Sequence, residues 1–299
     1  TLAQVFRNNG YQTMYFGPTA DNHLPLDRGI ERGFNIIRSG AISEWDNAYE
    51  QFIKSSNDNK PTFLFLHTYF VHDPYLTGHQ SPHRFTNLSE YPKIPLSVEE
   101  YRSLSPEFFS FVISSLRKNS SEELLKKFEK AQTQTELEDL FNTLFTDEER
   151  RIYFRNWNQG NIDKYDPNQI TYLKALYDEQ IYNLDQKLTR LFNLLNDPKL
   201  SKKTILVITA DHGEEFMEHG TLYHGQNLYL TSTAVPLIIY IPGAKPKKIT
   251  ELVQGIDIYP TVLSLTGLSP QSLIEGKNIS DLIFKKDTKV NEYVLSEYN

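Results

Sequence analysis

A group of carboxylate and imidazole side chains directly follows an apolar run at residues 204–210, "TILVITA". The group consists of Asp211, His212, Glu214, Glu215, Glu218, His219 and His224. An adjacent carboxylate and imidazole can bind a divalent cation such as Ca²⁺, Mg²⁺ or Mn²⁺, because carboxylate oxygens suit hard cations and the ring nitrogen adds a further donor. Asp211 and His212 are therefore the first candidate metal ligands.

The residues around this pair have several possible roles. Asp211 and His212 could also be polar only because a buried strand meets water at its end, without binding a ligand, and this alternative stays open. Gly213 is expected to permit a tight turn. His224, which has aromatic neighbours and precedes Gly225, suits either contact with an anionic oxygen, protonation of a leaving group, or a packed structural role. We expect Glu218, His219 and the other glutamates to be supporting or solvent-exposed groups.

A second apolar run, residues 62–66, also ends in imidazoles. His67 continues this run and is expected to be buried for structural reasons. His72 lies on the following turn, where Pro74 would stiffen the loop, and it suits anion binding better. If both strands end at the same edge of a sheet, the two groups of imidazoles would meet in one crevice.

The elements that must position these side chains alternate between strands and helices. Further strands are predicted within 11–17 and 235–243, and helices over 1–9, 169–196 and 257–267, the first and last ending at Gly10 and Gly267. The long helix has one apolar face: Ile170, Leu173, Leu176, Tyr177, Ile181, Leu184, Leu188, Leu191 and Leu195. Continuous apolar strands suit a sheet covered on both faces. The predicted fold class is α/β, with a doubly wound, mostly parallel sheet flanked by helices.

Residues 76–166 break this pattern. Pro and Ser residues come first, and helical segments with capping boxes follow. The boxes pair Ser97 with Glu100, Thr135 with Glu138, and Thr146 with Glu149. We predict a helical insertion at 76–166 within one α/β domain over 1–299. The insertion could act as a substrate-selecting cover or as a solvated structural insert.

Composition narrows the class of protein. The chain has 299 residues, 39% hydrophobic and 23% charged, with a formal net charge of −7, which predicts a globular protein that does not bind nucleic acid. No apolar run approaches the roughly 20 residues of a transmembrane helix. The chain has no Cys, which excludes disulfides, zinc thiolate sites and a thiol nucleophile within it.

Several segments together resemble the sulfatase family of the alkaline phosphatase superfamily. They are "TLAQVFRNNGYQTMYFG", "FLFLHTYFVHDPY", "YLKALYDEQIYNLDQKLTRLFNLL", "TILVITADHGEEFMEHG", "HGQNLYLTSTAVPLIIYIPG" and "GIDIYPTVLSLTGL". The resemblance implies an alkaline phosphatase-like fold and an enzyme that hydrolyses sulfate esters of small molecules or glycans. It also implies one divalent cation, usually Ca²⁺, with Mg²⁺ and Mn²⁺ also possible.

The resemblance assigns roles to four residues. Asp211 and His212 match the second pair of metal ligands of the family. His72 matches the histidine of its "PHxPY"-like segment, which contacts the sulfate group. His224 falls beside the position where relatives carry a Lys or His facing the ester oxygens. His72 and His224 are thus the candidate catalytic and substrate-binding residues.

Some family features do not occur in this sequence. The family nucleophile is a Cys or Ser in C/S-x-P-x-R that is oxidised to formylglycine, and the first acidic metal-binding pair lies near it. The nearest match, "QSPHR" at 80–84, has Gln at the nucleophile position, and Asn22 and His23 stand where a Lys follows "YFG" in the family. We expect a fragment that is incomplete at both ends, with the nucleophile upstream of Thr1, and that is inactive by itself.

Two other functions stay open at this point. One is a phosphoryl or phosphoethanolamine transferase or phosphoesterase of the same superfamily, and the other is a catalytically inactive module that binds anions or glycans. The sequence leaves the localisation open. The resemblance is compatible with a periplasmic, extracellular or membrane-anchored full-length protein.

Overall fold

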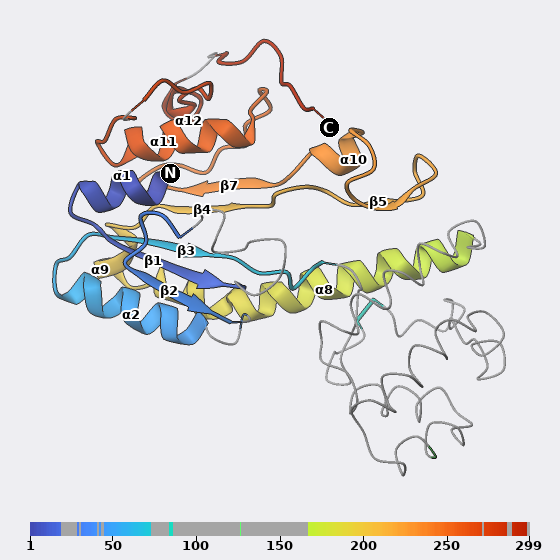
Figure 1. The fold of residues 1–299 in the computed structure, drawn as a ribbon, viewed down its shortest axis with the longest axis horizontal. Helices are drawn as coiled ribbons and strands as arrows, with labels where there is room; N and C mark the ends of the chain where they lie inside the picture. The colour runs from blue at the N-terminus through green and yellow to red at the C-terminus, as the bar shows by residue number, and fades with distance from the viewer. Residues whose placement is uncertain are drawn as a thin grey trace. The chain divides into compact units, whose positions relative to one another are not determined.

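A computed structural model of the chain describes residues 1–18, 29, 31–40, 42, 45–72, 84–85, 126, 167–270, 272–285 and 289–297 (Figure 1). The chain divides into two compact units. Unit 1 consists of Thr1–Phe70, Leu184–Gly213 and His224–Asn299, and unit 2 of Val71–Asn183 and Glu214–Tyr223. Apart from residues 84–85 and 126, the predicted insertion at 76–166 lies outside the described residues and stays a prediction.

A parallel sheet forms the first part of unit 1. Its strands are β1 (Gln12–Gly17), β2 (Ile36–Ser39) and β3 (Thr62–Leu66), in the order β2-β1-β3. Helix α1 (Leu2–Asn8) precedes β1, and α2 (Trp45–Asn57) connects β2 to β3. The predicted strands at 11–17 and 62–66 and the predicted first helix are confirmed, and that helix ends before Gly10, whose φ is +82°. β2 and α2 were not predicted.

The other two predicted strands of unit 1 pair with each other. β4 (Leu206–Thr209) runs antiparallel to β7 (Leu237–Tyr240), with Val207 opposite Ile239 (Figure 1). Burial on both faces, expected from their continuous apolar sequences, is not reached: the residues are half-buried except Thr209 and Ile238, which are exposed, Ile238 by 57%. The two runs were predicted correctly as strands, whereas their antiparallel pairing does not follow from composition.

Helix α8 (Pro167–Leu194) contributes to both units, because residues up to Asn183 belong to unit 2 and those from Leu184 onward to unit 1. The unit 2 core contains Ile170, Leu173, Leu176 and Tyr177, and the unit 1 core contains Leu188, Leu191 and Leu194. These contacts confirm the predicted amphipathic helix. Ile181 is 44% exposed, and it, Leu184 and Leu195 belong to neither of these two cores.

The core of unit 1 lies between α2, the parallel sheet and the last turns of α8. It is built on Met14, Phe16, Trp45, Ala48 and Tyr49. Arg190 of α8 forms an ion pair with Asp46 of α2, with 2.7 Å between Nη1 and Oδ1. Burial, together with the negative charge of Asp46, raises the pKa of Tyr49 to about 12, although Arg190 opposes the shift. The tyrosine therefore stays neutral in this core.

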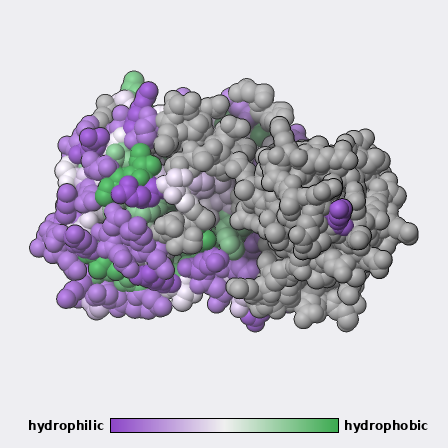
Figure 2. Space-filling model, turned by 60° about the horizontal axis from the view of Figure 1, so that its bottom comes forward, coloured by the Kyte–Doolittle hydropathy of each residue, from purple (hydrophilic) through white to green (hydrophobic). Residues whose placement is uncertain are grey.

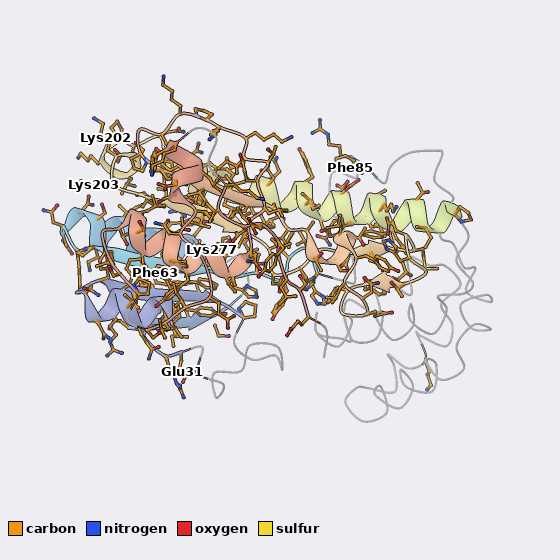
Figure 3. The ribbon with its side chains drawn as sticks, turned by 90° about the horizontal axis from the view of Figure 1, so that it is seen from above. Glu31, Phe63, Phe85, Lys202, Lys203 and Lys277 are labelled. Atoms are coloured by element: carbon orange, nitrogen blue, oxygen red, sulfur yellow. The ribbon has the colours of Figure 1, made fainter. Side chains whose placement is uncertain are left out.

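A second core of unit 1 forms between α1 and α11 (Ile258–Leu265). Phe6 stacks on Phe63 of β3, which is labelled in Figure 3, with 4.8 Å between ring centroids. Phe6 forms one cluster with Val262 and Leu263 of α11, and Phe63 packs against this cluster. The predicted helix at 257–267 is thus confirmed, although it begins as the 3₁₀ turn η4 (Gly255–Asp257). The remaining short helices are α9 (Pro198–Ser201), α10 (Leu230–Thr233) and α12 (Ser280–Phe284).

Asp257 fixes the last part of the chain to α11. It is fully buried, and its carboxylate accepts hydrogen bonds from the backbone N–H of Gln254 (2.9 Å) and Lys277 (2.8 Å) and from Nδ2 of Asn291 (2.7 Å). A buried carboxylate that accepts three hydrogen bonds is well satisfied. Asp257 is therefore a structural acid, not a candidate catalytic group.

Unit 2 contains the antiparallel hairpin of β5 (Glu215–Phe216) and β6 (Leu222–Tyr223). Phe216 and Leu222 pack on the first half of α8, and the ring centroids of Phe216 and Tyr177 lie 5.4 Å apart. Glu179 of α8 is also buried and accepts a hydrogen bond of 2.9 Å from the backbone N–H of Phe85. The hairpin interrupts unit 1 in sequence, between Gly213 and His224.

The described surface in Figure 2 is mainly hydrophilic, with separate small hydrophobic areas. This agrees with the mixed composition of the chain. Among the described residues, no helix combines the length and apolar character that are needed to cross a membrane.

Candidate metal and anion site

The loop after β4 carries the two predicted metal ligands. Asp211 follows two residues after the last strand residue, Thr209, and its side chain is 69% exposed. The side chain of the next residue, His212, is 37% exposed. Oδ1 of Asp211 accepts a hydrogen bond of 3.1 Å from the backbone N–H of His212, which holds the carboxylate against the loop. The strand thus ends in two accessible donor groups.

The orientation of the His212 ring leaves one nitrogen available. Nδ1 lies 2.8 Å from the carbonyl oxygen of Gly213. A carbonyl can only accept, so this hydrogen bond requires the proton on Nδ1 and leaves the lone pair on Nε2. Metal-binding histidines commonly donate their other ring N–H to a backbone carbonyl or carboxylate in this way. Nε2 lies 3.7 Å from Oδ2 of Asp211.

These two atoms fit a shared divalent cation. Ligand atoms at about 2.3–2.6 Å from one ion and at right angles to each other lie about 3.3–3.7 Å apart. The separation of 3.7 Å between Nε2 of His212 and Oδ2 of Asp211 agrees with this range. Two donors do not complete the coordination of such an ion, and within the described ranges no group of three or more His, Cys, Asp or Glu residues could hold a metal. The pair fits one part of a metal site.

His224 joins this pair. Its ring stacks on that of His212 with 3.9 Å between centroids and 27° between planes, and the residue is half-buried. Residues 212 and 224 belong to the same unit although a hairpin of the other unit separates them in sequence. The structure therefore brings together three of the four predicted site residues: Asp211, His212 and His224.

Gly213 fixes the loop to α10. Its N–H donates to the carbonyl oxygen of Ser232 at 2.7 Å, and a Cβ at position 213 would lie 2.0 Å from the carbonyl oxygen of Thr231. Gly213 does not have a positive φ. The structure assigns no turn at Gly213 itself, and the glycine is instead needed because the backbone of α10 approaches so closely. This contact between 213 and 231–232 was not predicted from the sequence.

The acidic residues between His212 and His224 have a different role. Glu215 is fully buried, Nδ1 of His219 lies 2.5 Å from its Oε1, and the hydroxyl of Thr221 donates to its Oε2. Glu215 was expected to be a supporting or solvent-exposed group, and of these two alternatives the structure excludes exposure to solvent. It is a structural group of unit 2.

Glu218 lies at the outer side of the same hairpin. Its Oε1 is 2.7 Å from Nζ of Lys174, and its Oε2 accepts a hydrogen bond of 2.6 Å from the backbone N–H of Phe216. Burial by itself would raise the pKa of Glu218, but the hydrogen bonds from Lys174 and from Phe216 outweigh it and lower the pKa. Glu218 thus agrees with the expected supporting role.

The fourth predicted site residue, His72, belongs to unit 2 and is half-buried. Pro74, which was expected to stiffen its loop, lies outside the described residues. The role of His72 stays a prediction. His67 is half-buried, its backbone N–H donates to the carbonyl oxygen of Phe16 at 2.9 Å, and its ring contacts Tyr69 at 4.9 Å between centroids.

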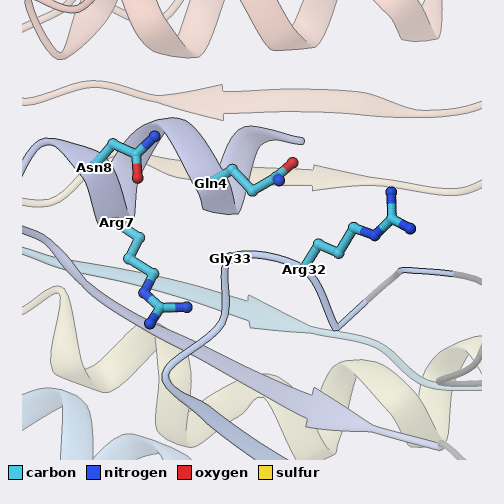
Figure 4. A pocket seen from close by; sticks show the side chains of 5 residues that line it. All are labelled: Gln4, Arg7, Asn8, Arg32 and Gly33. Atoms are coloured by element: carbon cyan, nitrogen blue, oxygen red, sulfur yellow. The ribbon is translucent and has the colours of Figure 1, made fainter.

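A cavity of about 450 Å³ lies elsewhere in unit 1. It is lined by Gln4, Arg7, Asn8, Arg32 and Gly33. In Figure 4, Arg7 and Asn8 extend from α1, and Arg32 and Gly33 belong to the turn beside it. None of the predicted site residues lines this cavity.

The chain is similar in sequence to known arylsulfatases. Arylsulfatase K of Gallus gallus is 30% identical over 135 residues, which cover 45% of this chain and 25% of that protein. Arylsulfatase K of Homo sapiens is 28% identical over 155 residues, covering 49% of this chain and 29% of that protein. The matches thus span less than a third of the length of these curated relatives.

Solved structures support the predicted fold class. A protein in complex with its substrate D-glucosamine-2-N,6-O-disulfate matches with a TM-score of 0.60 at 19% identity, covering 98% of this chain and 65% of that one. Phosphonate monoester hydrolase of Silicibacter pomeroyi matches with a TM-score of 0.58 at 17% identity, covering 98% of this chain and 63% of that one. The alkaline phosphatase-like α/β fold is confirmed. The sequence profile of the sulfatase family matches residues 1–268, and the chain belongs to this family.

Proposed function

We propose that the full-length protein hydrolyses sulfate esters of small molecules or glycans. One observation carries the proposal: in a member of the sulfatase family, Asp211 and His212 present accessible donor atoms, and the ring of His224 stacks on that of His212. Relatives that match this chain in sequence are named arylsulfatases, which supports a sulfate ester as the substrate. Because the chain corresponds to only part of those relatives, the activity is proposed for the whole protein.

The proposed metal is Ca²⁺, with Mg²⁺ and Mn²⁺ as substitutes. Oδ2 of Asp211 and Nε2 of His212 would bind it, and the hydrogen bond from Nδ1 of His212 to Gly213 would keep the ring in the required orientation. When bound, the cation supplies positive charge that stabilises negative charge on the ester oxygens. Further ligands, including a first acidic pair, are proposed to come from residues that precede Thr1.

His224 is proposed to act on the sulfate group itself. Its ring is held against that of His212, so its position depends on the same loop as the metal ligands. An imidazole at this position can donate a hydrogen bond to an ester oxygen or protonate the leaving oxygen. His72 is proposed to contact the sulfate group as well, on the basis of family resemblance. The proposed nucleophile is a formylglycine upstream of Thr1.

Loss of one metal ligand tests this function. In the full-length protein, Asp211→Asn keeps the size of the side chain but removes the charge that binds the cation. We expect kcat/KM for 4-nitrophenyl sulfate to fall about 100-fold or more. Ca²⁺ affinity, measured by calorimetry, should fall in parallel. The matched control is Asp58→Asn, which changes an exposed aspartate outside the site.

The outcomes separate the parts of the proposal. A wild-type protein that hydrolyses no sulfate ester in the presence of Ca²⁺, Mg²⁺ or Mn²⁺ would contradict the function. An active protein in which Asp211→Asn behaves like Asp58→Asn would contradict the metal assignment alone.

Hydrolysis of phosphonate or phosphate esters is a second candidate. The fold likeness to phosphonate monoester hydrolase, with a TM-score of 0.58, favours it over an inactive module that binds anions or glycans. The same preparation distinguishes the two hydrolytic functions when 4-nitrophenyl sulfate and 4-nitrophenyl phenylphosphonate are compared. A larger kcat/KM for the phosphonate would replace the sulfatase assignment.

A further inference from the structure

Three consecutive apolar side chains are exposed shortly after His224. Their exposed fractions are 43% for Leu228, 51% for Tyr229 and 79% for Leu230. Single exposed apolar residues are ordinary, but a contiguous group beside polar site residues is typical of a ligand-binding surface. Leu230 begins α10, the helix whose backbone contacts Gly213.

The segment that carries these side chains is fixed to the metal-ligand loop. Oδ1 of Asn227 accepts hydrogen bonds from the backbone N–H of Tyr229 (3.1 Å) and from the hydroxyl of Ser232 (3.3 Å). The carbonyl oxygen of Ser232 in turn accepts from the N–H of Gly213 at 2.7 Å. In sequence, residues 228–230 thus lie between His224, which stacks on His212, and Thr231 and Ser232, which contact Gly213.

The chemistry of this segment is uniformly uncharged. No Asp, Glu, Lys, Arg or His occurs from Gly225 to Ala244. A charged leaving group would find no ionic partner in this stretch, whereas an apolar one could cover the exposed surface of two leucines and a flat tyrosine ring. The segment therefore favours an uncharged group with extended apolar surface.

We propose that Leu228, Tyr229 and Leu230 form an apolar subsite that receives the apolar part of the leaving group of the ester. This inference rests on the proposed function and specifies how that site selects its substrate. The side chains would contact the leaving group and not the sulfate. Their contribution to kcat/KM should consequently grow with the apolar area of the leaving group. Their influence on the cleavage of the ester bond at sulfur should be small.

Two esters that differ in apolar area test the subsite. Phenyl sulfate and 2-naphthyl sulfate have similarly reactive leaving groups, but the naphthyl ring is larger. In the full-length protein, the ratio of kcat/KM for naphthyl over phenyl sulfate should exceed one. We expect Leu230→Ser and Leu228→Ser each to lower this ratio about five-fold and to leave kcat/KM for phenyl sulfate nearly unchanged. Leu273→Ser, at a fully exposed leucine, is the control and should keep the wild-type ratio.

Each result has a distinct meaning. Retained hydrolysis of phenyl sulfate shows that a variant is folded, so an unchanged ratio in both variants overturns the subsite while the proposed function stands. Variants that lose thermal stability without a change of ratio also overturn it, because another part of the protein would then cover these leucines. Failure of the wild-type protein to hydrolyse either ester counts against the proposed function itself.

Discussion

Two carboxylate–imidazole pairs lie close together in this sequence, and the structure uses them differently. In the first, Oδ2 of Asp211 and Nε2 of His212 are 3.7 Å apart, and the side chains are 69% and 37% exposed. In the second, Oε1 of Glu215 and Nδ1 of His219 are 2.5 Å apart, and the glutamate side chain is only 1% exposed. The two imidazoles are similarly exposed, at 37% for His212 and 31% for His219, so the pairs differ in the carboxylate, which is accessible only in the first pair.

The difference shows what makes such a pair available for binding. The second pair is satisfied by its own members and by Thr221, so its polar atoms are used within the hairpin. In the part of unit 1 that the structure describes, Oδ2 of Asp211 and Nε2 of His212 accept no hydrogen bond. The imidazole of His212 is held through its other nitrogen, Nδ1, by the carbonyl oxygen of Gly213. A pair of this kind can bind a ligand without first breaking internal contacts.

The largest expected effect comes from making the same substitution in both pairs. His212→Gln should lower kcat/KM of the full-length protein for a sulfate ester about 100-fold or more, since it removes a metal-binding nitrogen. His219→Gln should leave kcat/KM within about three-fold, because its nitrogen is used inside the hairpin. Steady-state kinetics at saturating Ca²⁺ would measure both. Equal losses of kcat/KM in the two variants would remove the distinction between the pairs.

Stability should respond in the opposite order. Glu215→Ala removes a buried carboxylate, so Nδ1 of His219 and the hydroxyl of Thr221 lose their hydrogen-bond partner. We therefore expect the free energy of unfolding to fall by about 3 kcal/mol. Asp211→Ala should change it by less than about 0.5 kcal/mol without metal, because the side chain is mainly exposed. Denaturant unfolding in the presence of a chelator would measure both values. A metal-free Asp211→Ala variant as unstable as Glu215→Ala would show that the first pair is structural too.

Much of the fold could be predicted because its signals are local. An apolar run predicts the strand at Thr62–Leu66. Amphipathic spacing and a following glycine predict the two helices that end before Gly10 and Gly267. β2 was missed because its four residues, Ile36–Ser39, include Arg38 and Ser39 and give no apolar run. The direction of β7 against β4 depends on which strands become neighbours, and that information is not contained in either strand.

The site could be predicted only in part. Asp211 and His212 were identifiable because they are adjacent and follow a strand, and His224 because of its aromatic neighbours, the following Gly225 and the family resemblance. The burial of Glu215 was not identifiable, since "HGEEFMEHG" shows several acids without showing which one the hairpin turns inward. The stacking of His224 on His212 joins residues on either side of that hairpin, and sequence spacing gives no measure of such a contact.

Gly213 provides a narrower test of the comparison, because it holds the first pair in place. Its substitution by Ala would put Cβ 2.0 Å from the carbonyl oxygen of Thr231, so the loop or α10 must move. We expect Gly213→Ala to lower stability by about 1–2 kcal/mol and Ca²⁺ affinity about ten-fold. Gly255→Ala is the control, since a Cβ at that position has open space around it. Unchanged Ca²⁺ affinity in Gly213→Ala would mean that the pair does not depend on the contact with α10.

The smallest expected effect concerns Glu218, an acid of the hairpin that is partly exposed and yet paired. Hydrogen bonds from Lys174 and Phe216 outweigh burial and lower its pKa below the ordinary value of 4.5. A carboxylate with a lowered pKa in the folded state stabilises the fold above that ordinary value, and the contribution is lost as pH falls through the lowered pKa. Since solvent screens this pair, Glu218→Gln should cost about 0.5 kcal/mol at pH 7 and less at a pH well below 4.5. Unfolding curves of both proteins at the two pH values would measure this difference, and Lys174→Met should show the same trend. A cost that does not change with pH would mean that the charge of Glu218, like that of Asp211, is not used to hold the fold together.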